Sequence, residues 1–145
     1  MNSRLWSALA FVVAGAGMVY LLSSRQFFAV GVLPAVVQVA AALLMIWARL
    51  TFGRRSFHAT ANTTAGGLVT NGPYRYWRHP IYAAIIWFIW AGQVYRFSPI
   101  ALLVCAIVSL ALFARMLMEE RELRRAYPDY AAYARKAKRL IPYVF

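Results

Sequence analysis

The chain has 145 residues, enough for one domain; 63% of them are hydrophobic and only 14% are charged. A soluble domain of this size could not bury so much apolar surface, so the composition excludes an ordinary soluble protein and favours a membrane protein. The net charge of +12 does not indicate a nucleic-acid binder, because the sequence lacks a basic stripe with interleaved aromatic residues.

Four uncharged runs predict an all-α integral membrane protein with about four transmembrane helices. Roughly 20 helical residues cross the hydrocarbon core, and the predicted spans are 5–22, 27–48, 80–95 and 98–118. The first run could instead be a signal peptide, but its apolar stretch is longer than a usual signal core. The third run has only 16 residues and is separated from the fourth by Arg96 and a Ser98-Pro99 turn. We therefore expect the last two spans to form a helical hairpin.

The basic residues predict the orientation of these spans. With four spans, the N-terminus, the loop 49–79 and the tail 119–145 share one side. That side, with the end of the last span, carries fourteen of the sixteen Lys and Arg residues, and only Arg25 and Arg96 lie opposite. Basic residues in short loops stay in the cytoplasm, so we expect both termini to be cytoplasmic, in a bacterial inner membrane. A three-span chain would put the basic loop and the basic tail on opposite faces.

The loop and the tail differ in character. The loop 49–79 is rich in glycine and small polar residues and is much longer than a helix connection requires, which favours a functional loop. The tail continues the fourth helix until Pro128, and residues 130–140 predict a short helix at the lipid surface. The tail holds all the acidic residues of the chain: Glu119, Glu120, Glu122 and Asp129.

The predicted hairpin joins two segments that lie far apart in the sequence. The third helix begins at Pro80, a residue type favoured at the first helical position. Antiparallel packing then brings five polar side chains to one end of the hairpin: Arg78, His79, Tyr82, Glu119 and Glu120. The helix N-terminus favours an anion, and the carboxylates favour a cation or hydroxyl groups. A ligand with a carboxylate, an ammonium group and a ribose, such as S-adenosylmethionine, matches this arrangement.

Residues 72–82, Gly-Pro-Tyr-Arg-Tyr-Trp-Arg-His-Pro-Ile-Tyr, resemble the Gly-Pro-Tyr…Arg-His-Pro-x-Tyr signature of the isoprenylcysteine carboxyl methyltransferase family. Glu119-Glu120 is similar to the Glu-Glu pair of that family, and the ending Leu140-Ile141-Pro142 to its usual tail. Ala84 stands where the family often has glycine. The chain is also shorter than the eukaryotic members, so it resembles a small prokaryotic-type member and a prenylated-protein substrate is not expected.

The resemblance implies a methyltransferase that uses S-adenosylmethionine and no metal. Its partners would be membrane lipids and a lipophilic small molecule or lipid, whose carboxylate, amine or thiol accepts the methyl group after entering from the bilayer. The implied cofactor-binding residues are Gly72, Pro73, Tyr74, Arg78, His79, Pro80, Tyr82, Glu119 and Glu120. Catalytic roles are expected for Arg78, His79 and Glu120, and Glu120 is slightly favoured over Glu119.

Two other functions compete with this interpretation. The C-terminal part of membrane sterol reductases, which use NADPH, has a similar Arg-His-Pro-x-Tyr motif and a similar ending, but those proteins have many more spans. A non-catalytic membrane subunit could also keep this fold and bind a partner.

Several other residues favour ordinary structural roles. Cys105 is the only cysteine, which excludes an internal disulfide and a cysteine-based metal site, and we expect it to pack in the fourth helix. Gly15 and Gly17 are expected to permit close helix packing. His58 could contact substrate or cofactor, although a histidine on the loop surface is the simpler interpretation. Six aromatic residues are expected at the lipid interface, although some of them could line the adenine site: Trp47, Trp77, Trp87, Trp90, Tyr74 and Tyr76.

Overall fold

The computed structural model describes residues 3–53 and 67–141. Within these ranges the chain is helical and contains no strand, as the sequence predicts, and its elements are α1 (Ser3–Ser23), α2 (Val32–Phe52), the short 3-10 helix η2 (Gly72–Arg75), α3 (Pro80–Ala91), α4 (Pro99–Ala126) and α5 (Tyr130–Lys136). Three helices are long and apolar enough to cross a membrane: Leu5–Ser23 within α1, α2 and α4. The chain is therefore an integral membrane protein.

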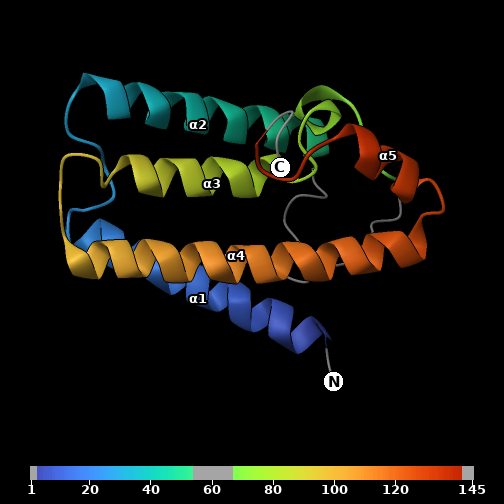
Figure 1. Cartoon of the computed structure of the whole chain (residues 1–145), viewed down its shortest axis with the longest axis horizontal. Helices are drawn as coiled ribbons and strands as arrows, with labels where there is room; N and C mark the ends of the chain where they lie inside the picture. Colours follow the sequence, from blue (N-terminus) through green and yellow to red (C-terminus); the bar gives the residue numbers. More distant parts are fainter. Residues whose placement is uncertain (1–2, 54–66, 142–145) are drawn as a thin grey trace.

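The helices form two packed pairs. α1 packs on α4 and α2 packs on α3, while α3 and α4 connect the two pairs. Consecutive helices run in opposite directions, so the beginning of α1, the end of α2, the beginning of α3 and the end of α4 lie at one end of the bundle, on the right in Figure 1. η2 and α5 lie at this end too, which gathers the polar segments there.

Small residues allow α1 to approach α4 closely. A Cβ atom at Gly17 would lie 2.3 Å from Cγ2 of Val108, whereas a Cβ atom at Gly15 would meet no atom within 4 Å. The predicted packing role is therefore correct for Gly17 and wrong for Gly15. Cys105 is buried in the core that these two helices share, as expected.

α3 ends earlier than the predicted span 80–95. It has 12 residues, Pro80–Ala91, a rise of about 18 Å that does not cross a hydrocarbon core of about 30 Å. α3 ends there because the connection between α1 and α2 passes close to it. A Cβ atom at Gly92 would lie 2.9 Å from the backbone oxygens of Gln26 and Phe27 in that connection. The Gln93 side chain also donates a hydrogen bond to the Gln26 carbonyl at 2.8 Å. The connection between α1 and α2 thus packs against the end of α3.

α2 begins at Val32 rather than at residue 27, because a buried amide organises the connection before it. Gln38 accepts a hydrogen bond from the Ala29 backbone N–H at 2.9 Å and donates one to the Phe27 carbonyl at 2.8 Å. The same side chain donates to the Phe88 carbonyl of α3 at 3.0 Å. Gln38 therefore satisfies backbone groups that would otherwise be unpaired in an apolar environment.

The C-terminal segment also differs from the prediction. α4 continues to Ala126 and ends before Pro128, as expected, but α5 ends at Lys136 instead of residue 140. Residues 137–140 instead run alongside residues 76–79, where the Lys138 N–H donates to the Tyr76 carbonyl at 3.0 Å. Tyr130 of α5 is buried against the protein. The contacts of α5 are thus with the polar end of the bundle.

Candidate functional site

The Gly-Pro-Tyr part of the motif packs against the end of α2. Gly72 has φ +55°, a conformation that favours glycine, and a Cβ atom there would lie 2.6 Å from the Thr51 hydroxyl. Pro73 is buried, and the buried Tyr74 ring lies 5.4 Å from the ring of Phe52. The expected lipid-interface position of Tyr74 is therefore wrong. Burial raises the pKa of the Tyr74 phenol, so its side chain stays neutral.

Backbone hydrogen bonds fix the Arg-His-Pro part of the motif. The Arg78 N–H donates to the Lys138 carbonyl at 2.6 Å and the His79 N–H to the Arg139 carbonyl at 3.3 Å. α3 then begins at Pro80, as the sequence predicts, and the His79 ring stacks on the Tyr82 ring at 5.6 Å. Arg78 and His79 are thus held between α3 and the C-terminal segment.

Glu120 is the centre of a cluster of arginine side chains. Arg139 donates two hydrogen bonds to its carboxylate, each at 3.1 Å. Arg78 Nη1 lies 2.9 Å from Oε1, and Arg124 donates to Oε2 at 3.4 Å. Only 2% of the Glu120 side chain is exposed. Burial of a charge is tolerated when it is paired in this way, and the guanidinium groups stabilise the carboxylate form.

Glu119 has a different and more open environment. Its Oε1 accepts a hydrogen bond from the Tyr82 hydroxyl and lies 3.3 Å from Arg115 Nε. Its Oε2 lies 3.8 Å from His79 Nδ1, which is beyond hydrogen-bond distance. The side chain is 23% exposed. One carboxylate oxygen of Glu119 thus keeps capacity to accept a hydrogen bond.

His79 lies between the two carboxylates. Its Nε2 is 3.4 Å from Glu120 Oε1, and no residue in the described ranges makes a well-directed hydrogen bond to that nitrogen. The imidazole is almost completely buried. This nitrogen is therefore available to a ligand or to a water molecule.

The structure thus brings together the five polar residues that were predicted to meet at one end of the hairpin: Arg78, His79, Tyr82, Glu119 and Glu120. Gly72, Pro73 and Tyr74 contact α2 and α5 instead, since the Tyr133 hydroxyl donates to the Tyr74 carbonyl at 2.7 Å. Glu122 pairs with the exposed Arg125 at 3.5 Å. His58 lies outside the described residues.

Sequence reasoning missed two residues of this cluster. Arg115 is buried in α4 and bonded to Tyr82 at 2.7 Å, and Arg139 reaches Glu120 from the tail. The signal for Arg115 was its position four residues before Glu119, which the sequence could only suggest as an ordinary helix-surface pair. No pattern connects Arg139 with Glu120, because their contact depends on the path of the tail.

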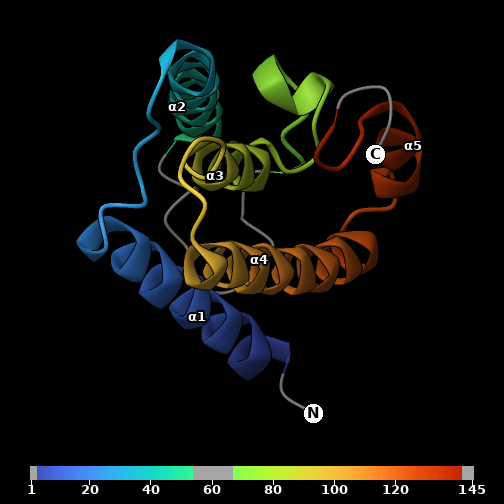
Figure 2. The same cartoon turned by 60° about the vertical axis from the view of Figure 1, so that its left-hand side comes forward.

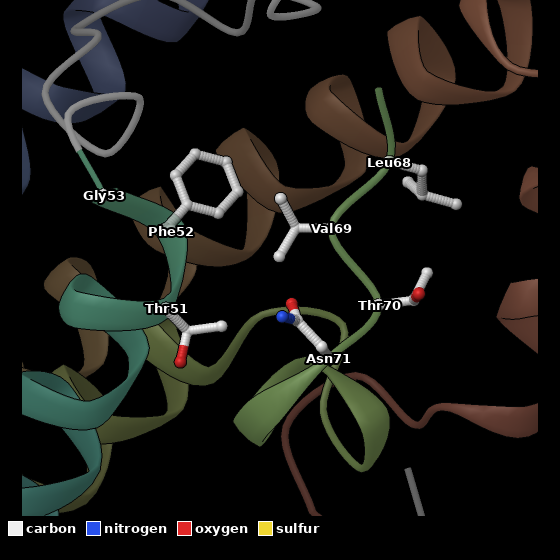
Figure 3. A pocket seen from close by; sticks show the side chains of 7 residues that line it. All are labelled: Thr51, Phe52, Gly53, Leu68, Val69, Thr70 and Asn71. Atoms are coloured by element: carbon white, nitrogen blue, oxygen red, sulfur yellow. The ribbon is translucent and has the colours of Figure 1, made fainter. Parts of the chain in front are cut away.

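A pocket of about 580 Å³ lies beside this region, lined by Thr51, Phe52, Gly53, Leu68, Val69, Thr70 and Asn71. Figure 3 shows the Phe52 ring and the Val69 side chain on facing sides of it. Because Phe52 also contacts Tyr74, the pocket lies on the α2 side of η2. None of the predicted site residues lines it.

A family model for isoprenylcysteine carboxyl methyltransferases (ICMT) matches residues 32–125. The chain belongs to the ICMT family. The match contains both Arg78–Tyr82 and Glu119–Glu120, whereas α1 and the segment from α5 to Arg139 lie outside it. Membership of the ICMT family makes this integral membrane protein a methyltransferase. Among curated proteins, none matches the chain closely enough to serve as a relative.

Proposed function

We propose that this ICMT-family protein uses S-adenosylmethionine to methylate a small lipophilic acceptor that enters from the bilayer. The observation that carries the proposal is the juxtaposition of a half-buried Glu119, a buried His79 and Tyr82 at the polar end of the bundle. All three residues lie inside the family match.

The residues present fit the chemical groups of the cofactor. When bound, S-adenosylmethionine supplies a methyl group that its sulfonium already activates. Glu119 Oε2 can accept a hydrogen bond from an ammonium group or a ribose hydroxyl, and His79 Nε2 has no hydrogen-bond partner in the described chain. Tyr82 and Arg115 hold Glu119 in place. Such pre-positioned groups align the acceptor with the methyl carbon, which is the main requirement of the reaction.

The contacts favour different roles for the two glutamates. Glu120 uses both carboxylate oxygens to bind Arg78 and Arg139, so it has little capacity left for a ligand. Glu119 is more exposed and keeps one oxygen available. We therefore assign the cofactor contact to Glu119 and a positioning role to Glu120, in place of the slight preference for Glu120 that the sequence suggested.

The membrane setting supports the proposed acceptor and the proposed orientation. Apolar side chains cover the outer faces of α1, α2 and α4, so a lipophilic carboxylate, amine or thiol can reach the polar end from within the bilayer. We assign that end to the cytoplasmic side of a bacterial inner membrane, because most Lys and Arg residues belong to segments at that end. The short α3 then enters the bilayer beside α4 as part of a four-helix bundle.

Calorimetric titration of the full chain in detergent with S-adenosylmethionine tests this proposal. We expect saturable binding that Tyr82→Phe weakens, because that change removes the hydroxyl between Glu119 and Arg115. Tyr95→Phe, the same substitution in an exposed residue after α3, is the matched control and should bind normally. Binding of NADPH instead would favour a reductase, and binding of neither would favour a non-catalytic subunit. Mass spectrometry of membranes with and without the protein then identifies the species that gains a methyl group.

A further inference from the structure

α1 contacts the candidate site although it lies outside the residues matched by the family model. Figure 2 shows α1 crossing α4 at an angle, and the two helices diverge toward the beginning of α1. The contact is made by Arg115. The first helix of this chain is therefore connected to the site by a specific side chain as well as by apolar packing.

Arg115 connects three elements of the bundle. Its Nη1 donates to the Ser7 carbonyl of α1 at 3.1 Å, and its guanidinium carbon lies 5.3 Å from the centre of the Phe11 ring. On the other side, its Nε donates to the Tyr82 hydroxyl at 2.7 Å and lies 3.3 Å from Glu119 Oε1. A guanidinium has donors in a fixed planar arrangement, so the position of α1 constrains the position of Tyr82 and Glu119.

Burial makes this connection important to the site. The Arg115 side chain is only 4% exposed, and a charge in such an environment must be fully paired. Ser7 and Phe11 are four residues apart and so occupy one face of α1, toward Arg115. If α1 moved away, the guanidinium would lose the carbonyl and the ring together.

α1 is also fixed further along, where Gly17 approaches α4. Ten residues separate Ser7 from Gly17, about 15 Å along the helix axis, and the close approach of Gly17 to Val108 sets the distance between α1 and α4 there. Val108 is β-branched and cannot readily rotate aside. The position of α1 on α4 is thus fixed at two points, Ser7 and Gly17.

We propose that α1 positions the cofactor-binding residues Tyr82 and Glu119 through Arg115. Arg115 is a positioning residue in this view, since it bonds to Tyr82 and Glu119 on one side and to α1 on the other. The inference rests on the proposed function, because its readout is the affinity for S-adenosylmethionine.

The first experiment measures that affinity by calorimetry for Arg115→Gln, Arg115→Lys and the control Arg125→Gln. We expect Arg115→Gln to weaken binding about tenfold or more, since it removes charge-assisted hydrogen bonds. Arg115→Lys keeps the charge and should recover part of the loss. Arg125 lies on the same helix with 78% of its side chain exposed, so Arg125→Gln should bind like the wild type.

A double variant separates positioning from general loss of structure. If Arg115 acts through Tyr82, the combined effect of Arg115→Gln and Tyr82→Phe on the dissociation constant should be smaller than the product of the two single effects. Independent structural damage would give multiplied effects instead and would overturn the inference.

The second experiment moves α1 without touching the site. Gly17→Ala should weaken cofactor binding several-fold, and a further Val108→Ala change should restore part of it by removing the atom that the new methyl group meets. Gly15→Ala makes the same chemical change at an open position and should bind normally. This series does not alter Arg115, so it remains decisive if Arg115→Gln fails to fold.

The outcomes distinguish the two proposals. Wild-type protein that binds no S-adenosylmethionine overturns the proposed function, and the inference falls with it. Wild-type protein that binds the cofactor, together with normal binding by folded Arg115→Gln or by Gly17→Ala, overturns the role of α1 alone.

Discussion

Glu119 and Glu120 are adjacent in sequence and lie in the same turn of α4, yet their surroundings differ. Glu120 is buried and bound by arginines from the segment before α3, from α4 and from the tail. Glu119 is partly exposed and contacts Tyr82 and Arg115, which in turn contacts α1. Neighbouring residues on a helix point about 100° apart, so the two side chains meet different sets of neighbours around His79.

Two identical residues in one motif can therefore have different roles, one in holding the structure and the other in binding a ligand. A carboxylate saturated with guanidinium groups holds chain segments together, since removing it would leave the nearly buried Arg78 without that negative charge. A carboxylate with one unused oxygen is suited to a ligand. Substitutions can test whether this division is real.

Glu120→Gln should have the largest effect on folding. The amide cannot compensate the positive charges of Arg78 and Arg139, and breaking a buried ion pair costs about 3 kcal/mol or more. Thermal unfolding in detergent should show a large drop in the midpoint or loss of a cooperative transition. Glu122→Gln, the same change in a pair with the exposed Arg125, should leave the midpoint almost unchanged.

Glu119→Gln should weaken binding of S-adenosylmethionine more than it lowers stability. A charged hydrogen bond contributes about 1.5–3 kcal/mol, which corresponds to a roughly ten- to hundredfold rise in the dissociation constant. Calorimetry on the folded variant measures this dissociation constant. The assignment of roles is contradicted if folded Glu120→Gln protein binds the cofactor more weakly than Glu119→Gln protein.

Parts of this site could be predicted because they depend on local rules. The uncharged runs located the long helices, Pro80 begins α3, and the predicted Ser98-Pro99 turn lies at the start of α4. The meeting of Arg78 and Glu120 follows once two antiparallel helices are assumed. These inferences needed only hydropathy, helix-capping preferences and the length of a turn.

The remaining parts depend on contacts that leave no pattern in the sequence. α1 is apolar on all sides, so hydropathy cannot tell which face meets α4, and the contact of Ser7 with Arg115 could not be anticipated. The pairing of residues 76–79 with 137–140 uses backbone groups that every residue has. The early end of α3 results from the close passage of another segment at Gly92.

Arg139→Gln should have a moderate effect on stability. Arg139 donates two parallel hydrogen bonds to Glu120 and is only 25% exposed, so its loss should cost about 1.5 kcal/mol. Limited proteolysis should also show faster cleavage of the tail, because Arg139 holds residues 137–140 beside the motif. Unchanged cleavage together with an unchanged unfolding midpoint would mean that the backbone hydrogen bonds alone hold the tail.

Tyr133→Phe should lower stability by about 1 kcal/mol, the usual contribution of one hydrogen bond, because it removes the donor to the Tyr74 carbonyl. Burial raises the pKa of Tyr133 above that of an exposed phenol. A folded-state pKa above the unfolded value adds stability that is fully present below the unfolded pKa, about 10 for tyrosine, and is lost as pH rises through the folded pKa. The difference between wild type and variant should therefore stay constant from about pH 6 to 9 in thermal unfolding.

Arg124→Gln should have the smallest effect of the series. Arg124 also reaches Glu120, but its side chain is 55% exposed and its single hydrogen bond is 3.4 Å long. Solvent screens such a pair, so the change in stability should stay within about 0.5 kcal/mol. Arg124 and Arg139 bind the same carboxylate. Comparing the unfolding midpoints of the Arg124→Gln and Arg139→Gln variants therefore separates the effect of burial and geometry from the effect of charge. Equal losses of stability in the two variants would mean that only the number of arginines around Glu120 matters. The distinction between the buried carboxylate of Glu120 and the partly exposed carboxylate of Glu119 would then lose its structural basis.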